Sequence, residues 1–336
     1  MTDNKTIERQ WNAGELLKVS GSFWESCTLH SAVELDVFTA ISSTPTTCEE
    51  VAEKLNIPVD GLNRLLNALT AMQLLIKKEK SFTTTPESEM FLSKHSEKYI
   101  GFLIRHHYNL SHTWSRLAEA VSKGEPFRRN VEEMPPNYIE SFLMGMHTIS
   151  SFTAPTLMHA IDLSDCNHLL DLGGGPGTYA IQFCNANPNL KGTVFDLPTS
   201  RSFAEKNIAN FGLSNRIDFI DGNFNTDEIT GKYDAIWMSH ILHSEGDDGC
   251  SKLIEKAAAR LNPNGKIIIH EFILDNNATG PLFPALFTLN MFLHTDKGKS
   301  YTEEELSNML TNAGLKNIQR PTVKTPMNSG IIIGSK

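Results

Sequence analysis

Short apolar runs alternate with amphipathic stretches along the C-terminal half of the chain. The apolar runs predict strands at 168–172, 192–197, 217–221, 233–238, 266–273, 316–320 and 330–333. Apolar residues at helical spacing fall between them, at 178–184, 202–211 and 250–261. This alternation predicts a largely parallel sheet with helices on both faces. In such a sheet, ligands bind at the carboxyl ends of the strands.

The pattern over residues 25–160 is mainly helical instead. Thr47 followed by Glu50 is a capping-box signature, so a helix is expected from there to about Leu55. A second helix is expected from residue 60 to 71, and a short β-hairpin follows within 74–85. Helix, turn, helix and hairpin form the outline of a winged helix.

Charge argues against DNA recognition by this segment. Residues 25–100 carry seven basic and eleven acidic side chains, a net charge of −4. The would-be recognition helix offers Arg64 as its only cation, and the whole chain of 336 residues has a net charge of −9. A surface that follows phosphates needs the opposite sign. We therefore expect a dimerisation or substrate-covering role here, and no nucleic-acid partner.

Composition indicates an ordinary folded protein, with 40% hydrophobic and 21% charged residues. The length suggests two domains. No apolar run reaches the roughly 18 residues of a membrane helix, and residues 1–10 lack the apolar core of a signal peptide. The five cysteines are scattered without a Cys-x-x-Cys pair. We expect a reduced, cytoplasmic protein without membrane association, disulfides or structural zinc.

A glycine-rich stretch follows the first predicted strand, with the pattern Asp-x-Gly-x-Gly-x-Gly from Asp171 to Gly177. It lacks the lysine of a phosphate-binding P-loop. It also lacks the third glycine of a dinucleotide fingerprint, because Thr178 stands there. The pattern resembles motif I of class I S-adenosyl-L-methionine (SAM) methyltransferases. The members expected to contact that cofactor are Asp171, Gly173, Gly174 and Gly175.

An acidic residue ends the second predicted strand. Asp196 lies 21 residues after Gly175, close to the spacing of about 20 at which a carboxylate meets a ribose. A carboxylate accepts hydrogen bonds from both hydroxyls of a ribose. Together with the glycine loop, Asp196 predicts a nucleoside-containing cofactor.

Nearly the whole chain resembles the metal-independent small-molecule O-methyltransferases, the group of the caffeic acid, hydroxyindole and polyketide-tailoring enzymes. The resemblance implies a Rossmann-like, doubly wound, seven-stranded SAM-binding sheet and an N-terminal winged-helix dimerisation domain. It implies a homodimer, SAM as methyl donor and S-adenosyl-L-homocysteine (SAH) as product, with no metal. It divides the chain into a dimerisation domain (1–100), linker helices at the acceptor pocket (101–164) and a catalytic domain (165–336).

The resemblance also implies the catalytic residues. His243, just beyond the fourth strand, falls on the family's general base, and an imidazole takes a hydroxyl proton near neutral pH. Glu271, at the end of the fifth strand, and Glu303 match two glutamates that orient this base. Glu303 has an alternative interpretation as an acid at a helix start that Thr302 caps. His270 is expected to be a core histidine.

Two further sets of contacts follow from the resemblance. Additional cofactor contacts are expected at Leu197, Asp221, Gly222, Asn223, Phe224 and Ser239. Acceptor contacts are expected at Phe142, Met146, His147, His240, Phe287, Asn290, Met291 and His294. The chain departs from the family pattern where Ser244-Glu245 replaces Asp-Trp and where Asn223 replaces an aspartate. We expect the added histidines to favour a smaller or more polar acceptor.

Several alternatives stay open at this point. The same fold methylates sulfur, nitrogen or carbon as well as oxygen. A winged-helix regulator that senses a metabolite belongs to another class, although the charge of residues 25–100 disfavours it. A nicotinamide oxidoreductase is disfavoured by Thr178. The densest histidine group, within 106–112, has no carboxylate pair at ligand spacing, so no metal is expected there.

Overall fold

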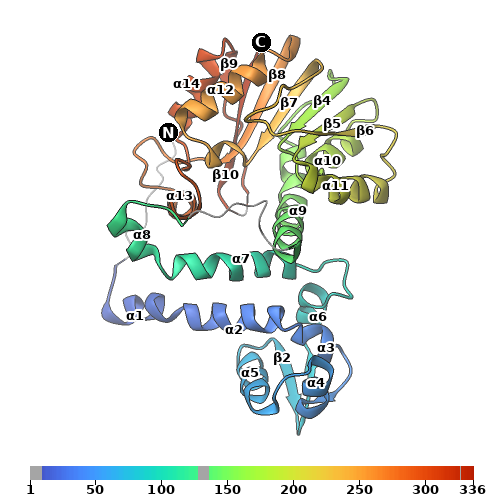
Figure 1. Ribbon diagram of the computed structural model, residues 1–336, viewed down its shortest axis with the longest axis vertical. Coiled ribbons are helices and arrows are strands. Elements are labelled where there is room, and N and C mark those ends of the chain that lie inside the picture. Colours follow the sequence, from blue (N-terminus) through green and yellow to red (C-terminus); the bar gives the residue numbers. More distant parts are fainter. Residues whose placement is uncertain (1–9, 128–135, 326) are drawn as a thin grey trace. The chain divides into compact units, whose positions relative to one another are not determined.

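The computed structural model describes residues 10–127, 136–325 and 327–336. Backbone contacts separate two compact units, Met1–Asn109 and Leu110–Lys336. Helix α7 (Gly101–Trp114) crosses the boundary between them (Figure 1). The boundary expected at residue 100 lies close to this division, and the predicted linker segment is not separated as a unit of its own.

The N-terminal unit is mainly helical and contains one small sheet. Before α7, its helices are α1 (Ala13–Gly21), α2 (Phe23–Glu34), α3 (Val37–Ile41), α4 (Cys48–Leu55), α5 (Val59–Ala71) and α6 (Pro86–Leu92). Its strands are β1 (Thr46–Thr47), β2 (Leu75–Lys78) and β3 (Ser81–Thr84). They pair antiparallel in the order β1-β3-β2. The helices α4 and α5 with the β2–β3 hairpin therefore give the predicted succession of helix, turn, helix and hairpin.

Local sequence explains why these elements form. The Thr47 hydroxyl accepts the backbone N–H of Glu50 at 3.3 Å, and the Glu50 carboxylate accepts the backbone N–H of Thr47 at 2.7 Å. This capping box satisfies two amides that a helix start leaves without partners, and it confirms the predicted start of α4. Along α5, the periodic residues Leu62, Leu66 and Leu69 are buried in the core of the unit.

The second unit is built on a seven-stranded sheet. Its strands are β4 (His168–Leu172), β5 (Lys191–Asp196), β6 (Ile217–Asp221), β7 (Tyr233–Ser239), β8 (Leu261–Phe272), β9 (Lys316–Gln319) and β10 (Ser329–Ser335). Their order is β6-β5-β4-β7-β8-β10-β9. The first five strands in this order run parallel, and β10 pairs antiparallel with β8 and with β9. The predicted α/β fold class is thereby confirmed.

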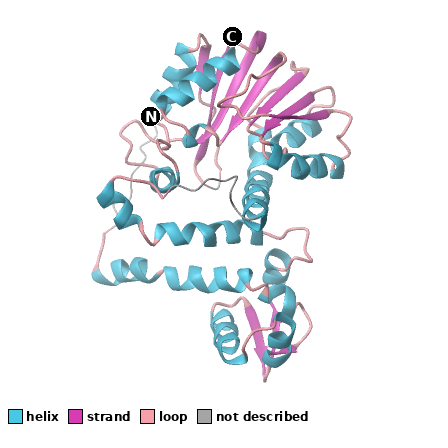
Figure 2. Ribbon diagram, in the orientation of Figure 1, coloured by secondary structure: helices cyan, strands magenta, loops and turns pink. Residues whose placement is uncertain are grey.

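Helices cover both faces of this sheet (Figure 2). After α7, the helices of this unit are α8 (Leu117–Lys123), α9 (Pro136–Met158), α10 (Thr178–Ala186), α11 (Pro198–Asn210), α12 (Asp247–Ala258), α13 (Leu282–His294) and α14 (Glu303–Asn312), with a 3₁₀ turn, η2 (Leu242–Ser244). One core cluster joins the sheet to α12 and α14, and the other joins it to α9, α10 and α11. Neighbouring residues of β4 divide between the clusters, Leu169 in one and Leu170 in the other, because strand side chains alternate between faces.

The strand order fixes where a ligand fits. The chain leaves β4 toward β5 on one side of the sheet and later returns to place β7 on the other side of β4. In open α/β sheets, the crevice for a ligand lies at such a reversal, beyond the carboxyl ends of the strands. The glycine loop, Asp196, η2 and Glu271 all follow or end strands at this edge.

All five cysteines are free thiols, and four of them are buried. Within the described ranges, no helix has both the length and the apolar character needed to cross a membrane.

Candidate active site

The glycine loop leaves β4 and turns directly into α10. Gly173 and Gly175 have backbone φ angles of +69° and +51°, a region that non-glycine residues rarely adopt. The N–H of Gly173 donates to the carbonyl oxygen of Phe195 at 2.8 Å, which ties the loop to the end of β5. This geometry brings the backbone of the loop to the ligand edge of the sheet.

Asp171 supports the loop from within the protein. Its side chain is fully buried, and Oδ2 accepts the N–H of Ala180 in α10 at 3.0 Å. Burial raises the pKa of Asp171 to about 7. A Cβ added at Gly174 would lie 2.6 Å from Cγ of Asp171. Asp171 therefore shapes the loop, and Gly174 leaves room for its carboxylate.

Asp196 faces the glycine loop from the end of β5. Its Oδ2 accepts the N–H of Gly175 at 2.7 Å, while Oδ1 accepts the N–H of Leu197 at 2.7 Å and the hydroxyl of Ser200 at 2.9 Å. Burial raises the pKa of Asp196 against the effect of these hydrogen bonds. A carboxylate has about four acceptor positions. Three are used within the chain, so one on Oδ2 is left for a ligand hydroxyl, which fits the ribose of SAM.

The next stretch of predicted cofactor residues follows β6. The N–H of Gly222 donates to the carbonyl oxygen of Asp196 at 2.9 Å, so this stretch lies beside the ribose position. Asp221 forms an ion pair with Arg201 at 2.8 Å. The amide oxygen of Asn223 accepts the N–H of Asn225 at 2.9 Å, which leaves one of its two lone pairs for an adenine amine. Phe224 packs, partly buried, against the core.

Ser239, which the resemblance predicts as a cofactor contact, also makes a contact within the chain. Its hydroxyl lies 2.9 Å from Nδ1 of His270, whose Nε2 lies 2.8 Å from the hydroxyl of Ser329. His270 is fully buried and stacks on Trp237 with ring centroids 5.5 Å apart. Burial, and then the charge of nearby His240, hold the pKa of His270 well below its usual value. His270 is thus a core histidine with both ring nitrogens paired, as predicted.

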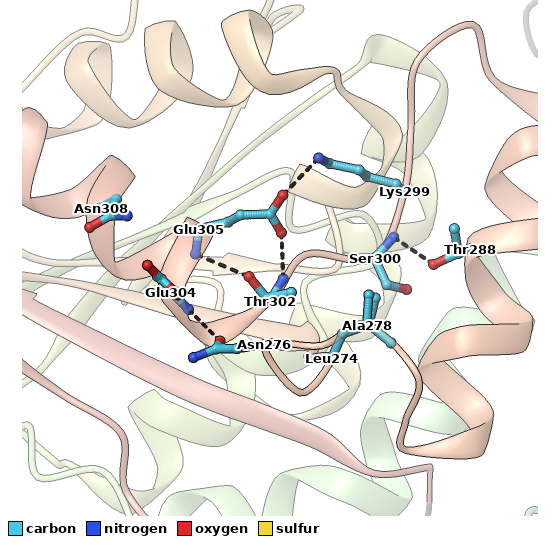
Figure 3. A pocket seen from close by; sticks show the side chains of 10 residues that line it. All are labelled: Leu274, Asn276, Ala278, Thr288, Lys299, Ser300, Thr302, Glu304, Glu305 and Asn308. Atoms are coloured by element: carbon cyan, nitrogen blue, oxygen red, sulfur yellow. Dashed lines mark hydrogen bonds and ion pairs between the residues drawn. The ribbon is translucent and has the colours of Figure 1, made fainter.

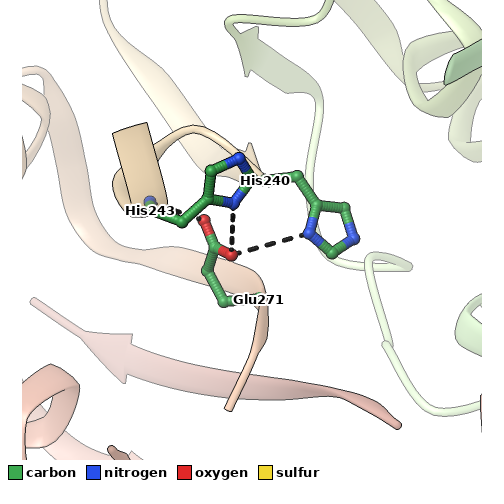
Figure 4. Close-up of side chains that lie close together, drawn as sticks. All are labelled: His240, His243 and Glu271. Carbon is green, nitrogen blue, oxygen red and sulfur yellow. Dashed lines mark hydrogen bonds and ion pairs between the residues drawn. The ribbon is translucent and has the colours of Figure 1, made fainter. Parts of the chain in front are cut away.

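His243 and Glu271 form a close pair at this edge (Figure 4). Nδ1 of His243, in η2, lies 2.9 Å from Oε2 of Glu271, near the end of β8. The other carboxylate oxygen, Oε1, accepts the backbone N–H groups of Leu242 and His243 at 3.0 and 3.2 Å. One carboxylate therefore orients both the imidazole and the turn that carries it.

The electrostatics of this pair favour a charged carboxylate. Burial of Glu271 would by itself raise its pKa, but the charge and hydrogen bond of His243, together with the nearby ring of His240, outweigh burial. The pKa of Glu271 is therefore held well below its usual range. Nδ1 of His240 lies 3.5 Å from Oε2 of the same carboxylate, outside hydrogen-bonding geometry. Burial lowers the pKa of His240, which favours the neutral imidazole.

Three phenylalanine rings form an aromatic wall beside the histidines. Phe287, in α13, meets the ring of His243 edge-on with centroids 4.8 Å apart, and its place in an acceptor pocket stays a prediction. Phe272 packs on Phe287 at 4.6 Å and on Phe283 at 4.9 Å. The sequence pattern did not single out Phe272 and Phe283 as neighbours of His243. Phe272 follows Glu271 directly, and Phe283 precedes Phe287 by one helical turn.

Other predicted acceptor residues lie on α9 and α13, and several have their polar atoms engaged. Nδ1 of His147 lies 2.8 Å from the hydroxyl of Thr178, at the start of α10. Asn290 accepts the indole N–H of Trp114 at 2.9 Å, and Nε2 of His294 lies 2.7 Å from the hydroxyl of Thr113. The remaining three differ in exposure: Met291 is buried, Met146 is half-buried and Phe142 is exposed.

The contacts of Glu303 do not include the His243–Glu271 pair. It is the first residue of α14, which Thr302 caps in a capping box with Glu305. Its carboxylate forms an ion pair with Arg320, and no hydrogen bond among the described residues joins it to His243. These contacts favour the alternative interpretation from the sequence, an acid at a helix start.

A separate pocket opens beside the start of α14 (Figure 3). Its lining is polar, with Glu305 bonded to Lys299 and to the backbone of Thr302. None of its lining residues is a predicted cofactor or acceptor residue: they are Leu274, Asn276, Ala278, Thr288, Lys299, Ser300, Thr302, Glu304, Glu305 and Asn308.

Comparison with known proteins decides the family. A profile of the O-methyltransferase domain matches residues 114–316, and a profile of the O-methyltransferase dimerisation domain matches residues 17–94. The chain belongs to the O-methyltransferase family. The resemblance seen in the sequence is thereby confirmed, and this family member is a methyltransferase.

Individual relatives extend over nearly the whole chain. The 3-hydroxy-5-methyl-1-naphthoate 3-O-methyltransferase of Streptomyces sahachiroi is 30% identical over 96% of this chain and 94% of its own length. The N,N-dimethyltransferase OxyT of Streptomyces rimosus is 29% identical over 96% of each chain. The structure of human N-acetylserotonin methyltransferase in complex with SAM matches with a TM-score of 0.85 and 26% identity, covering 98% of this chain and 99% of that one.

Proposed function

We propose that this family member transfers the methyl group of SAM to a hydroxyl group of a small molecule, with His243 as general base. The observation that carries the proposal is the 2.9 Å contact between Nδ1 of His243 and Oε2 of Glu271. It stands at the edge of the sheet where the glycine loop and Asp196 gather. The family supports methyl transfer as the reaction, and the relative that methylates a naphthoate hydroxyl supports oxygen as the atom.

The residues beyond β4 and β5 fit the cofactor. The open acceptor position on Asp196 suits a ribose hydroxyl, and the second lone pair of the Asn223 amide oxygen suits the adenine amine. The left-handed backbone at Gly173 and Gly175 keeps side chains away from this space. When bound, SAM supplies a methyl group already activated by its sulfonium. The chain therefore has to align the acceptor and remove one proton.

Glu271 sets the tautomer of the proposed base, His243. Its Oε2 accepts from Nδ1 of His243, which fixes the tautomer with hydrogen on Nδ1 and a lone pair on Nε2. Nε2 then takes the proton of the acceptor hydroxyl, and the carboxylate stabilises the imidazolium that results. Glu303 is bound to Arg320, so we assign the orienting role to Glu271 and a helix-start role to Glu303.

The surroundings of His243 indicate the kind of acceptor. Phe272, Phe283 and Phe287 offer aromatic faces and edges beside the base, and such surfaces pack well against a flat ring. The nearby imidazole of His240 adds one polar group. We therefore propose an aromatic hydroxyl compound with a polar substituent as the acceptor.

N-methylation is a second candidate, because the relative from Streptomyces rimosus is named an N,N-dimethyltransferase. An amine acceptor also loses a proton on methylation, and His243 serves that step equally. A panel that pairs each phenol with the matching aniline separates the two candidates.

We also propose that the protein is a homodimer formed through the N-terminal unit. The matched dimerisation domain covers α1 from residue 17, all of α2 and the whole small sheet. Large apolar side chains of α1 and α2 are exposed, with Leu17 and Trp24 at 72% and 71% of their full surface. Several large exposed apolar side chains on two successive helices fit an interaction site.

Calorimetric titration with SAH tests the cofactor assignment first. Wild-type protein is expected to bind SAH, and Asp196→Ala is expected to lose most of this affinity because the ribose loses its carboxylate acceptor. Asp165→Ala, an exposed carboxylate on the loop before β4, is the matched control and keeps wild-type affinity. Absence of SAH binding by the wild type would overturn the proposed function.

A further inference from the structure

Three side chains with metal-binding atoms converge beside β7 and β8. They are His240, His243 and Glu271, and their ligand atoms all lie within 4.8 Å of one another (Figure 4). Both imidazole rings approach the same carboxylate oxygen, with Nδ1–Oε2 distances of 2.9 Å for His243 and 3.5 Å for His240. Methyl transfer with His243 as base needs only the contact between His243 and Glu271. It gives no role to the approach of His240 to the same carboxylate.

The separations match a coordination polyhedron. Nitrogen and oxygen ligands lie about 2.0–2.2 Å from a zinc ion. Two such ligands are then about 2.8–3.1 Å apart in octahedral geometry and about 3.3–3.6 Å apart in tetrahedral geometry. The two nitrogen–oxygen distances, 2.9 and 3.5 Å, fall within these ranges. All three ligand atoms lie within 4.8 Å of one another, so a bound ion has to draw the two imidazoles closer together.

His240 is held in place with a free ligand atom. Its Nδ1 is buried without a hydrogen-bond partner, and a buried polar atom without a partner is costly. Its backbone is left-handed, with φ at +55°. Its ring packs on Phe272 and His270 at centroid distances of 4.3 and 4.4 Å. The fold therefore keeps a nitrogen lone pair beside a buried carboxylate, where a cation would satisfy both.

We propose that His240, His243 and Glu271 bind a divalent transition-metal ion of the zinc type. Two imidazoles and one carboxylate form a donor set that suits zinc and its neighbours, and three protein ligands leave one position open for water or another oxygen. A neutral imidazole is the form of histidine that coordinates a metal. The sequence pattern His-x-x-His across a turn gave no such prediction, because Glu271 lies on a different strand.

Metal binding and base catalysis exclude each other at this site. A metal on Nδ1 of His243 displaces the proton from that nitrogen, so the neutral ring carries its hydrogen on Nε2. Nε2 then has no lone pair for the acceptor hydroxyl. The metal ion therefore acts as an inhibitor of methyl transfer. This consequence rests on the proposed function, whereas metal binding itself does not.

Titration with Co²⁺ tests the site directly. Tag-free protein is titrated while the visible ligand-field absorption of the metal is recorded, and Zn²⁺ is then added as competitor. Wild type is expected to bind one Co²⁺ per chain and to release it to Zn²⁺. His240→Leu is expected to weaken Co²⁺ binding by at least about tenfold, since even the loss of an outer-shell partner costs about 10–100-fold.

Two controls keep the outcome interpretable. His159→Leu removes an exposed histidine on the loop after α9 and is expected to bind Co²⁺ as the wild type does. His240→Phe retains the ring volume if His240→Leu does not fold. SAH binding by each variant shows that the fold persists. Equal Co²⁺ affinity in wild type and either His240 variant, or no stoichiometric binding by the wild type, would overturn the proposal.

The failure of this inference is distinguishable from a failure of the proposed function. A chain that binds Co²⁺ through His240 but does not bind SAH keeps the metal site and loses the methyltransferase assignment. A chain that binds SAH but not Co²⁺ gives the reverse result. Zn²⁺ inhibition of methyl transfer that disappears in His240→Phe supports the exclusion argument, and inhibition of equal strength in both proteins contradicts it.

Discussion

Nδ1 of His243 lies 2.9 Å from Oε2 of Glu271, while Oε1 of the same carboxylate accepts the backbone N–H of His243. The ring and its own backbone are thus held by one buried side chain from the neighbouring strand. Both positions follow from the parallel pairing of β7 with β8, in which Ser239 stands opposite His270. The imidazole of His243 is oriented by the sheet itself.

Replacing Glu271 tests this relationship. In Glu271→Gln, an amide N–H₂ facing Nδ1 favours the tautomer with hydrogen on Nε2, which leaves no lone pair for the acceptor. We expect kcat to fall by about 10²–10⁴-fold, with SAH affinity close to that of the wild type. Steady-state kinetics with an accepted hydroxyl compound and calorimetry with SAH measure the two quantities.

Glu303→Gln separates the two glutamates that the sequence proposes. Because its carboxylate is bound to Arg320 at the start of α14, we expect a kcat near the wild-type value and a small loss of thermal stability. A loss of kcat as large as in Glu271→Gln would show that Glu303 also acts on the base.

Gly174→Ala tests the packing beneath the glycine loop. The added Cβ would lie 2.6 Å from Cγ of Asp171, so the loop or the carboxylate has to move. We expect a destabilisation of about 1–3 kcal/mol and weaker SAH binding. Thermal unfolding measures the first effect. Gly61→Ala, in the exposed first turn of α5 with nothing within 4 Å of its Cβ, is the control and is expected to match or exceed wild-type stability.

Charged substitutions in α1 and α2 test the dimer. Leu17 and Trp24 are the most exposed apolar residues of these helices, and a glutamate at each position places two charges in the proposed interface. We expect Leu17→Glu/Trp24→Glu to elute as a monomer in size-exclusion chromatography with light scattering. Val121→Glu alters another exposed apolar residue, on α8, and is expected to stay dimeric. A dimeric double variant would place the interface elsewhere.

Acidification is expected to destabilise the fold. Because burial holds the pKa of His270 well below the imidazole value, its contribution to stability is complete above about pH 6.5 and is lost as the pH falls toward the folded pKa. Five other histidines have lowered pKa values and the same sign: His30, His107, His147, His168 and His240. Asp171, with its pKa raised to about 7, and Asp196, whose pKa burial also raises, act with the opposite sign: they stabilise the fold as the pH falls from their folded pKa toward about pH 4.

The histidines outnumber these two carboxylates. We therefore expect the midpoint temperature of thermal unfolding to decrease as the pH is lowered from about 7.5 to about 5.5. His270→Asn removes the largest buried imidazole contribution while keeping a donor and an acceptor for Ser239 and Ser329. Its midpoint is expected to depend less steeply on pH. An equal slope in the two proteins would mean that His270 does not titrate between the folded and unfolded states.

Much of the fold follows from local sequence. The apolar run at β4 predicts its bounds because a strand buried on both faces has few polar positions, and Thr47 with Glu50 marks a helix start that backbone amides require. Strand β4, the capping box of α4 and the β2–β3 hairpin depend only on residues that are neighbours in the chain. Element ends are less certain: α11 starts at Pro198, four residues before the periodic pattern becomes visible.

The site is predictable only in part, because its contacts join distant segments. The resemblance locates His243 and Glu271, and the structure brings them together. The ion pair of Glu303 with Arg320 and the hydrogen bonds of Asn290 and His294 with α7 carry no sequence signal. The approach of His240 to Glu271 is equally invisible, since it depends on a left-handed residue at the end of β7.

The most direct test of the account is methyl transfer by His243→Ala. Wild type and variant are incubated with SAM and a panel of aromatic hydroxyl compounds with matched anilines, and products are identified by mass spectrometry. The wild type is expected to give an O-methylated product. The variant is expected to lose about 10²–10⁴-fold in rate, with SAH binding intact. An undiminished rate in His243→Ala would contradict the assignment of His243 as the base.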